Sequence, residues 1–145
     1  MTTVRPCSVH DALELLGPRW TFLVLRELMF GTTRFDAVVA ATGASRNLVA
    51  ERLRRLEEAG LVRRDTYQEH PPRHDYRLTD EGRRVAEVLL VLMRVGDERR
   101  DDEPPVRWHH GSGGDRHELD VELVCRRCGR PASEGLGDPV GRGAP

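Results

Sequence analysis

Apolar residues in the first two thirds of the chain repeat with the spacing of helices, and turn residues separate the repeats. Ser and Thr favour the start of a helix, whereas Gly and Pro favour its end, because each suits the backbone geometry there. The pattern predicts helices over residues 8–16 with Ser8 as the N-cap, over 20–29, over 35–42 and over 46–59 with Ser45 as the N-cap. It also predicts a last helix that Thr79 caps and that includes Val85–Val95.

Two short segments before the last helix alternate apolar and polar residues, which is typical of strands. Leu61–Tyr67 and Arg73–Leu78 flank the loop 68–72, so they predict an antiparallel hairpin. Helix, short helix, turn, longer helix and hairpin is the order of a winged helix-turn-helix. The expected fold class is therefore mainly α with a small β wing (α+β).

The predicted helix over residues 46–59 carries candidate DNA contacts. Val49, Leu53 and Leu56 form one apolar stripe that would face the core, so the polar side would face outward. The N-terminal end of such a helix enters the major groove, where Arg pairs with guanine and Asn with adenine. The candidate DNA-binding residues are Ser45, Arg46, Asn47, Ala50 and Arg54 on this helix and Arg73 at the tip of the hairpin.

The opposing interpretation is a solvated surface helix with ion pairs between successive turns, such as Arg54 with Glu58. The net charge of −1 hides an asymmetry, because residues 1–96 hold 15 Arg against 13 acidic residues and residues 97–145 hold 8 Arg against 11. The local field at the contact surface decides DNA binding, not the sum over the chain. The turn before the helix and the hairpin after it favour the DNA-binding interpretation.

The last predicted helix is apolar nearly all round between Val85 and Val95. A small monomer would expose a large apolar face if it carried such a helix on its surface. We therefore expect a homodimer that packs through the N-terminal and C-terminal helices of the patterned part.

Five further segments matter together, namely Leu15–Thr21 (LLGPRWT), Leu25–Leu28 (LREL), Ser45–Leu48 (SRNL), Glu51–Val62 (ERLRRLEEAGLV) and Pro71–Thr79 (PPRHDYRLT). They resemble the HxlR-type winged-helix transcription regulators of the MarR-like group, over about residues 5–96. The resemblance implies a homodimer on a roughly palindromic DNA operator, a recognition helix around Ser45–Ala59 and a wing around Pro71–Arg73. Arg46 stands where this family often has Pro, so the base preference does not carry over.

Cys7 is the candidate sensor of an oxidant or electrophile. It lies just before the first predicted helix, with Arg5 and His10 nearby, and a helix N-terminus and nearby cations favour a thiolate. By resemblance, a cysteine at this place senses oxidants, quinones or aldehydes in several relatives. Three alternatives remain open: a small buried residue packed at the dimer interface, a cysteine inherited in the family without a sensing role, and a small-molecule effector bound between Trp20, Phe22 and the last helix.

The C-terminal part contains Cys125 and Cys128 in a C-x-x-C-G turn, after a predicted strand over Glu118–Val124. This turn is typical of a zinc knuckle, but structural zinc needs four ligands. The rest of the set would come from nearby histidines, namely His109, His110 and His117, or from a second chain. A disulfide, a knuckle without metal and a thiol oxidoreductase are the competing interpretations.

The expected organisation is a DNA-binding and dimerisation domain over residues 1–96, an acidic linker and C-x-x-C knuckle over 97–133, and a disordered tail over 134–145. No apolar run is long enough to cross a bilayer, and no secretion signal is recognised, so we expect a cytoplasmic protein. The leading function is a dimeric regulator, expected to be a repressor and not an enzyme. A winged-helix interaction protein without DNA is the alternative.

Overall fold

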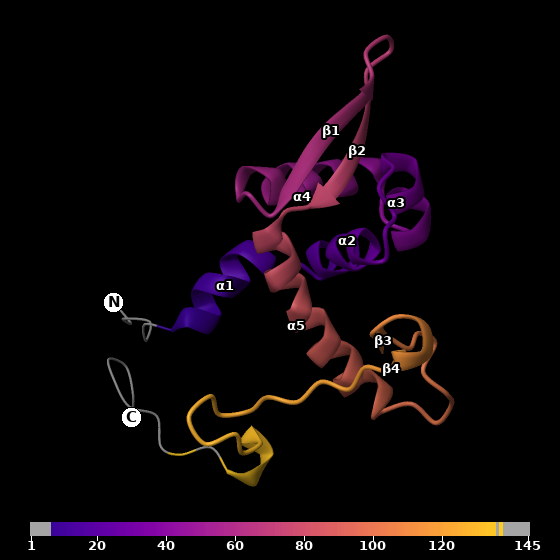
Figure 1. Ribbon diagram of the computed structural model, residues 1–145. Coiled ribbons are helices and arrows are strands. Elements are labelled where there is room, and N and C mark those ends of the chain that lie inside the picture. Colours follow the sequence, from indigo (N-terminus) through magenta and orange to yellow (C-terminus); the bar gives the residue numbers. More distant parts are fainter. Residues whose placement is uncertain (1–6, 136, 138–145) are drawn as a thin grey trace, which may run out of the picture. The chain divides into compact units, whose positions relative to one another are not determined.

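The computed structural model describes residues 7–135 and residue 137 (Figure 1). The chain divides into two compact units, Met1–Leu89 and Leu90–Pro145, and the boundary lies inside the last long helix, before the expected boundary near residue 96. Most of the tail expected over 134–145 lies outside the described residues.

The first unit contains the elements of a winged helix-turn-helix, as the sequence predicts. Each helix and strand predicted for this unit is present within a few residues of its expected ends, and the last helix begins at Asp80, directly after its predicted cap Thr79. In chain order the elements are α1 (Ser8–Leu16), α2 (Arg19–Met29), α3 (Phe35–Thr42), α4 (Arg46–Glu58), β1 (Val62–Gln68), β2 (Arg73–Leu78) and α5 (Asp80–Asp97), which continues into the second unit.

Two of the three predicted helix caps are confirmed. The Ser45 hydroxyl accepts a hydrogen bond from the Leu48 amide at 3.3 Å, and the Thr79 hydroxyl accepts one from the Gly82 amide at 3.0 Å. The prediction for Ser8 is wrong. The helical backbone begins one residue earlier, so Cys7 is the N-cap of α1 and its carbonyl accepts a bond from the Asp11 amide.

The core of the first unit lies around α2, which packs against α3, α4 and β2. Its buried apolar residues come from both strands and from every helix, although α1 and α3 contribute one residue each, Leu16 and Val38. The predicted inward stripe of α4 is confirmed, because Val49, Leu53 and Leu56 are almost completely buried.

The wing is the hairpin of β1 and β2. Its register pairs Val62 with Leu78 and becomes irregular between Thr66 and Gln68. The hairpin is attached to the segment between α2 and α3, because the Tyr76 amide donates to the Thr33 carbonyl at 2.8 Å and Arg34 forms an isolated antiparallel bridge with Asp75. This segment acts as a short third strand that fixes the base of the wing.

The first turn of α5 crosses the start of β1 at close range. Gly82 is buried there, and a Cβ at this position would lie 1.9 Å from the Leu61 carbonyl oxygen. The same carbonyl accepts a hydrogen bond from the Thr79 amide at 3.0 Å. Only glycine fits this backbone contact without a shift of α5 or β1.

The second unit consists of the C-terminal part of α5 and mostly irregular chain. It holds the two-residue strands β3 (His109–His110) and β4 (His117–Glu118) and two short 3-10 helices, η1 (Gly113–Asp115) and η2 (Ala132–Glu134). The predicted strand over Glu118–Val124 is wrong beyond Glu118. Within the described residues, only Val124 of the remaining segment forms a β-bridge, with Pro131, so the segment makes isolated backbone hydrogen bonds and no continuous ladder.

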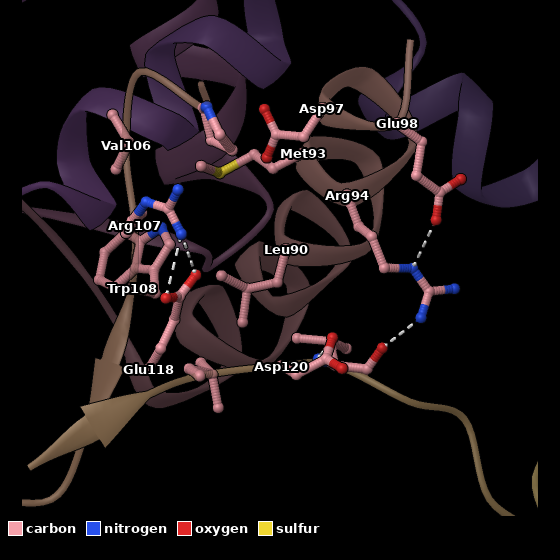
Figure 2. A pocket seen from close by; sticks show the side chains of 13 residues that line it. Leu90, Met93, Arg94, Asp97, Glu98, Val106, Arg107, Trp108, Glu118 and Asp120 are labelled. Atoms are coloured by element: carbon pink, nitrogen blue, oxygen red, sulfur yellow. Dashed lines mark hydrogen bonds and ion pairs between the residues drawn. The ribbon is translucent and has the colours of Figure 1, made fainter. Parts of the chain in front are cut away.

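Salt bridges and carbonyl contacts hold this irregular chain (Figure 2). The Arg107 guanidinium donates to both oxygens of Glu118, at 2.9 and 3.1 Å. Arg94 of α5 donates to the Val121 carbonyl at 2.5 Å and also pairs with Glu98. In the described part of the chain no helix is both long enough and apolar enough to cross a bilayer.

Candidate nucleic-acid interface

The outward face of α4 presents the predicted contact residues. Burial of the Val49, Leu53 and Leu56 stripe fixes the rotation of the helix, so the opposite side faces solvent. The residues exposed on this side or at its N-cap are Ser45, Arg46, Asn47, Ala50 and Arg54. The structure therefore leaves all of them accessible, and their contact with DNA stays a prediction.

Arg46 is held by α3 in the free protein. Its guanidinium pairs with the Asp36 carboxylate at 2.5 Å and lies 4.9 Å from the centre of the Phe35 ring. Both ion-pair partners are well exposed, so water and salt weaken this interaction. Because a phosphate or a guanine would compete with Asp36 for the same donors, Arg46 must exchange partners to contact DNA.

Arg54 and Asn47 differ in their partners on the same face. Arg54 pairs with Glu58 one turn later at 2.5 Å, which is the pair expected for a solvated helix. Asn47 makes no side-chain hydrogen bond within the described residues, so its amide group is available to a base edge. Asn47 can therefore contact a base without breaking a side-chain hydrogen bond, whereas Arg54 would first have to leave Glu58.

The position of α4 depends on the short helix before it. The turn between the helices contains Gly43 with a φ of +69°, a left-handed conformation that favours glycine. The Thr42 hydroxyl donates to the Val38 carbonyl at 2.8 Å, and Val38 is fully buried. α3 is therefore a packed brace, and Figure 1 shows it beside the N-terminal end of α4.

Asp75 connects the wing to the body, and the sequence reasoning missed this residue. Its carboxylate, which is mostly buried, pairs with Arg34 at 2.8 Å and accepts a hydrogen bond from the Thr33 hydroxyl at 3.2 Å. The Arg34 guanidinium also lies 3.8 Å from the centre of the Tyr67 ring in β1. The Thr33–Asp75 hydrogen bond joins residues 42 positions apart in the chain, and no local pattern indicates such a contact.

A hollow of about 710 Å³ separates the wing from the N-terminal ends of α3 and α4. Its lining is cationic and aromatic, a combination that suits a phosphate backbone. Arg73, the predicted residue at the wing tip, is exposed and makes no ion pair within residues 7–135. The residues that matter here are Arg34, Arg46, Tyr67, Arg73 and His74.

The HxlR-like helix-turn-helix family model matches residues 15–104, more than half of the chain. The chain belongs to this family. It is 44% identical over 124 residues to Rv3095 of Mycobacterium tuberculosis, an uncharacterized HTH-type transcriptional regulator, covering 84% of this chain and 77% of that protein.

Solved structures of this family type extend the similarity. PA1607, described as a candidate transcription factor, superposes with a TM-score of 0.74 at 28% identity over 90% of this chain and 93% of its own. The redox regulator HypR in its oxidized form gives a TM-score of 0.60 at 28% identity, over 66% of this chain and all of its own. The protein is therefore a transcriptional regulator with an HTH DNA-binding domain.

The HxlR-like chain carries Cys7 as an exposed residue at the N-cap of α1. Of the two cations expected to act on its thiol, Arg5 lies outside the described residues. The other, His10, pairs with Glu14 at 3.5 Å. Sensing at Cys7 stays a prediction. Trp20 and Phe22, named for the alternative effector site, are half-buried against the core.

Cys125 and Cys128 are both exposed in a hydrogen-bonded turn. The backbone amides of Cys128 and Arg127 and the Cys128 thiol donate to the Cys125 sulfur, and these bonds lower the pKa of Cys125. The predicted completion of a metal set by histidines is not seen in one chain, because the described residues contain no group of three or more His, Cys, Asp or Glu placed to hold an ion. A metal at the two cysteines stays a prediction.

His109 and His117 lie in β3 and β4. The His117 ring is 5.5 Å from that of His110, with which it pairs across the hairpin. The His117 Nδ1 lies 2.9 Å from the Asp115 carbonyl, and the His109 Nδ1 lies 3.4 Å from Arg116. These histidines are therefore engaged within their own hairpin.

Proposed function

We propose that the protein is a homodimeric repressor in the cytoplasm that reads a palindromic operator with α4 of each protomer. The observation that carries this proposal is the exposed face of α4, with Arg46 and Asn47 at its N-terminal end and a fully buried stripe behind them. Two such helices related by a twofold axis would meet two inverted half-sites one turn of DNA apart, about 34 Å. Repression requires only that the bound dimer occupies the DNA.

The exposed apolar residues of two helices support the dimer. α1 exposes Val9 and Leu13, and α5 exposes Val88, Leu92 and Val95 at the spacing of one helix face. Such faces are typical of a surface that a second chain covers.

The test is selection of genomic fragments by the purified protein, followed by sequencing and quantitative binding. An inverted repeat with half-sites about 10 base pairs apart is expected. Affinity should fall with log salt at a slope of about −0.9 for each phosphate neutralised. Absence of salt-dependent retention would instead favour the interaction protein without DNA.

Replacement of the base-reading residues should change sequence preference. We expect Arg46→Ala and Asn47→Ala each to weaken operator binding by about 1–3 kcal/mol and to lower the preference for operator over random DNA. Arg73→Ala should weaken both DNAs alike and reduce the salt slope by about 0.9, because phosphates carry no sequence. Fluorescence anisotropy on both duplexes over a salt series measures these changes.

A matched control is Arg63→Ala in the same hairpin. Arg63 pairs with Asp65 at 3.0 Å and lines a different hollow, beside Met29 and Arg83. Its removal should leave both affinities nearly unchanged. Unaltered sequence preference in the Asn47→Ala protein would show that this residue does not read a base.

We further propose that Cys7 is the sensor of an oxidant or electrophile. Its exposure at the α1 N-cap and the similarity to HypR, a redox regulator, support this role. With diamide as the oxidant, two Cys7 thiols of a dimer would lose two electrons and two protons to the diazene and form an intersubunit disulfide. A bond at the end of α1 would change the angle between protomers and hence the spacing of the two α4 helices.

The expected result is that diamide or a quinone changes operator affinity in wild type and not in Cys7→Ser. The Cys125→Ser/Cys128→Ser protein serves as the matched thiol control and should respond like wild type. Gel shifts with and without reductant, together with non-reducing electrophoresis, measure this. A Cys7→Ser protein that responds as wild type does would remove Cys7 as the sensor.

A further inference from the structure

The C-terminal knuckle, defined as residues 123–132, is a turn built by its own backbone hydrogen bonds. The Cys125 amide donates to the Arg130 carbonyl at 2.9 Å, and the Gly129 amide donates to the Cys125 carbonyl at 2.8 Å. Val124 and Pro131 form an antiparallel bridge at its base. Gly129 has a φ of +71°, so the turn needs glycine there. The backbone thus brings Cys125 and Cys128 together in one small hairpin.

Both thiols of the knuckle lie at its surface. Both cysteines are exposed and are not joined by a disulfide. Their side chains are therefore accessible to an ion and to a second protein surface.

The described residues of one chain supply only half of the ligands that structural zinc requires. Zinc in a structural site takes four ligands in a tetrahedron. Within residues 7–135 no third His, Cys, Asp or Glu joins the two cysteines in a group that could hold a metal. With the ligands that the described residues offer, a site made from this knuckle needs two more, and another chain can contribute them.

We propose that the knuckles of two protomers share one zinc ion, held by Cys125 and Cys128 of each chain. The second copy is the natural donor, because a twofold axis through the ion presents an identical pair of thiolates. This inference rests on the homodimer of the proposed function. Binding releases the remaining protons of the four thiols to solvent, and no oxidation state changes.

The charge of the knuckle supports four thiolates. A zinc ion with four thiolates carries two net negative charges. Arg126, Arg127 and Arg130 are exposed around each cysteine pair and make no ion pair within the described residues. The Arg side chains of both knuckles would offset the negative charge of the zinc–thiolate complex. A pair of neutral thiols without metal has no charge to offset.

The test measures metal and mass on the same full-length protein, purified with reductant and without chelator. Inductively coupled plasma mass spectrometry should find about one zinc per two chains, and light scattering should give the mass of a dimer. After zinc is replaced by Co²⁺, the absorption spectrum should show the strong visible bands of a tetrahedral site and intense thiolate-to-cobalt charge-transfer bands. These bands should saturate at about one Co²⁺ per two chains.

Three variants decide which residues hold the ion. Cys125→Ser/Cys128→Ser should lower the zinc content at least about tenfold, because both ligands of each chain, and so all four of the shared site, are lost. Cys7→Ser is the matched cysteine control and should keep its zinc. His109→Ala/His117→Ala should also keep it. Zinc at one per chain, zinc absent from the wild type, or zinc lost in the histidine variant would each overturn the shared site.

The outcome is separable from that of the proposed function. Operator binding and dimer mass are measured on the same preparations as the zinc content. A zinc-free dimer that binds its operator would overturn the metal site alone. A zinc-containing dimer that retains no DNA would overturn the regulator proposal alone.

Discussion

A protein with Val88→Arg and Leu92→Arg is expected to be monomeric at micromolar concentration and to bind its operator at least about a hundredfold more weakly than wild type. Val88 and Leu92 lie one turn apart on α5, and 46% of each side chain is exposed. In a symmetric interface each introduced arginine would face the same arginine of the partner protomer, or it would lose its hydration against apolar side chains. The loss of affinity follows because a monomer engages only one half-site, whereas linked sites gain about 10²–10⁴ in avidity.

Light scattering measures the oligomeric state, and anisotropy on operator DNA measures the affinity. Glu87→Arg is the matched control, because Glu87 is exposed on the same helix but lies more than a quarter turn away from Val88 and Leu92. It should remain dimeric and bind as wild type does. A double variant that stays dimeric with full affinity would place the interface elsewhere. Circular dichroism checks that the variants are folded.

Gly82→Ala is expected to destabilise the protein by about 3 kcal/mol, although alanine normally stabilises a helix by up to about 1 kcal/mol over glycine. The reason is the contact with Leu61, whose carbonyl oxygen would lie 1.9 Å and whose carbonyl carbon 2.8 Å from the new Cβ. Both are backbone atoms beside a buried residue, so no flexible side chain can move aside. The start of α5 or of the wing would have to shift.

Thermal unfolding measures this effect, with an expected fall in Tm of about 12–24 °C for a domain of this size. Gly96→Ala is the matched control in the same helix. Within the described residues, nothing lies within 4 Å of a Cβ at Gly96. Alanine there should leave Tm unchanged or raise it slightly. Equal Tm values for the two variants would contradict the close contact between α5 and Leu61.

Several parts of the candidate site could be predicted from the sequence. The apolar period of α4 gave its inward stripe, and hence the outward face with Arg46 and Asn47, because burial of one face determines the other. The caps at Ser45 and Thr79 followed from the chemistry of their hydroxyl groups. Ser8 was the exception, because Cys7 is the N-cap residue of α1 and its side chain makes no capping hydrogen bond.

Other parts could not be predicted from one sequence. The predicted strand over Glu118–Val124 shows that alternation alone does not make a strand, because a strand also needs a hydrogen-bonding neighbour. The attachment of the wing by Asp75 and Arg34 depends on where two distant segments of backbone meet. The requirement for glycine at position 82 has the same origin.

The sequence by itself determined the order of the elements of the first unit and the face of α4 that looks outward. These depend on hydrogen bonds and apolar spacing within a few residues, which neighbouring positions specify. Only the tertiary structure decided which partner each arginine contacts. Arg46 pairs with Asp36, and Arg34 contacts both Asp75 and Tyr67. Arg73 makes no ion pair in the described residues. An arginine side chain is long enough to reach several partners, so the packed backbones determine which one it contacts.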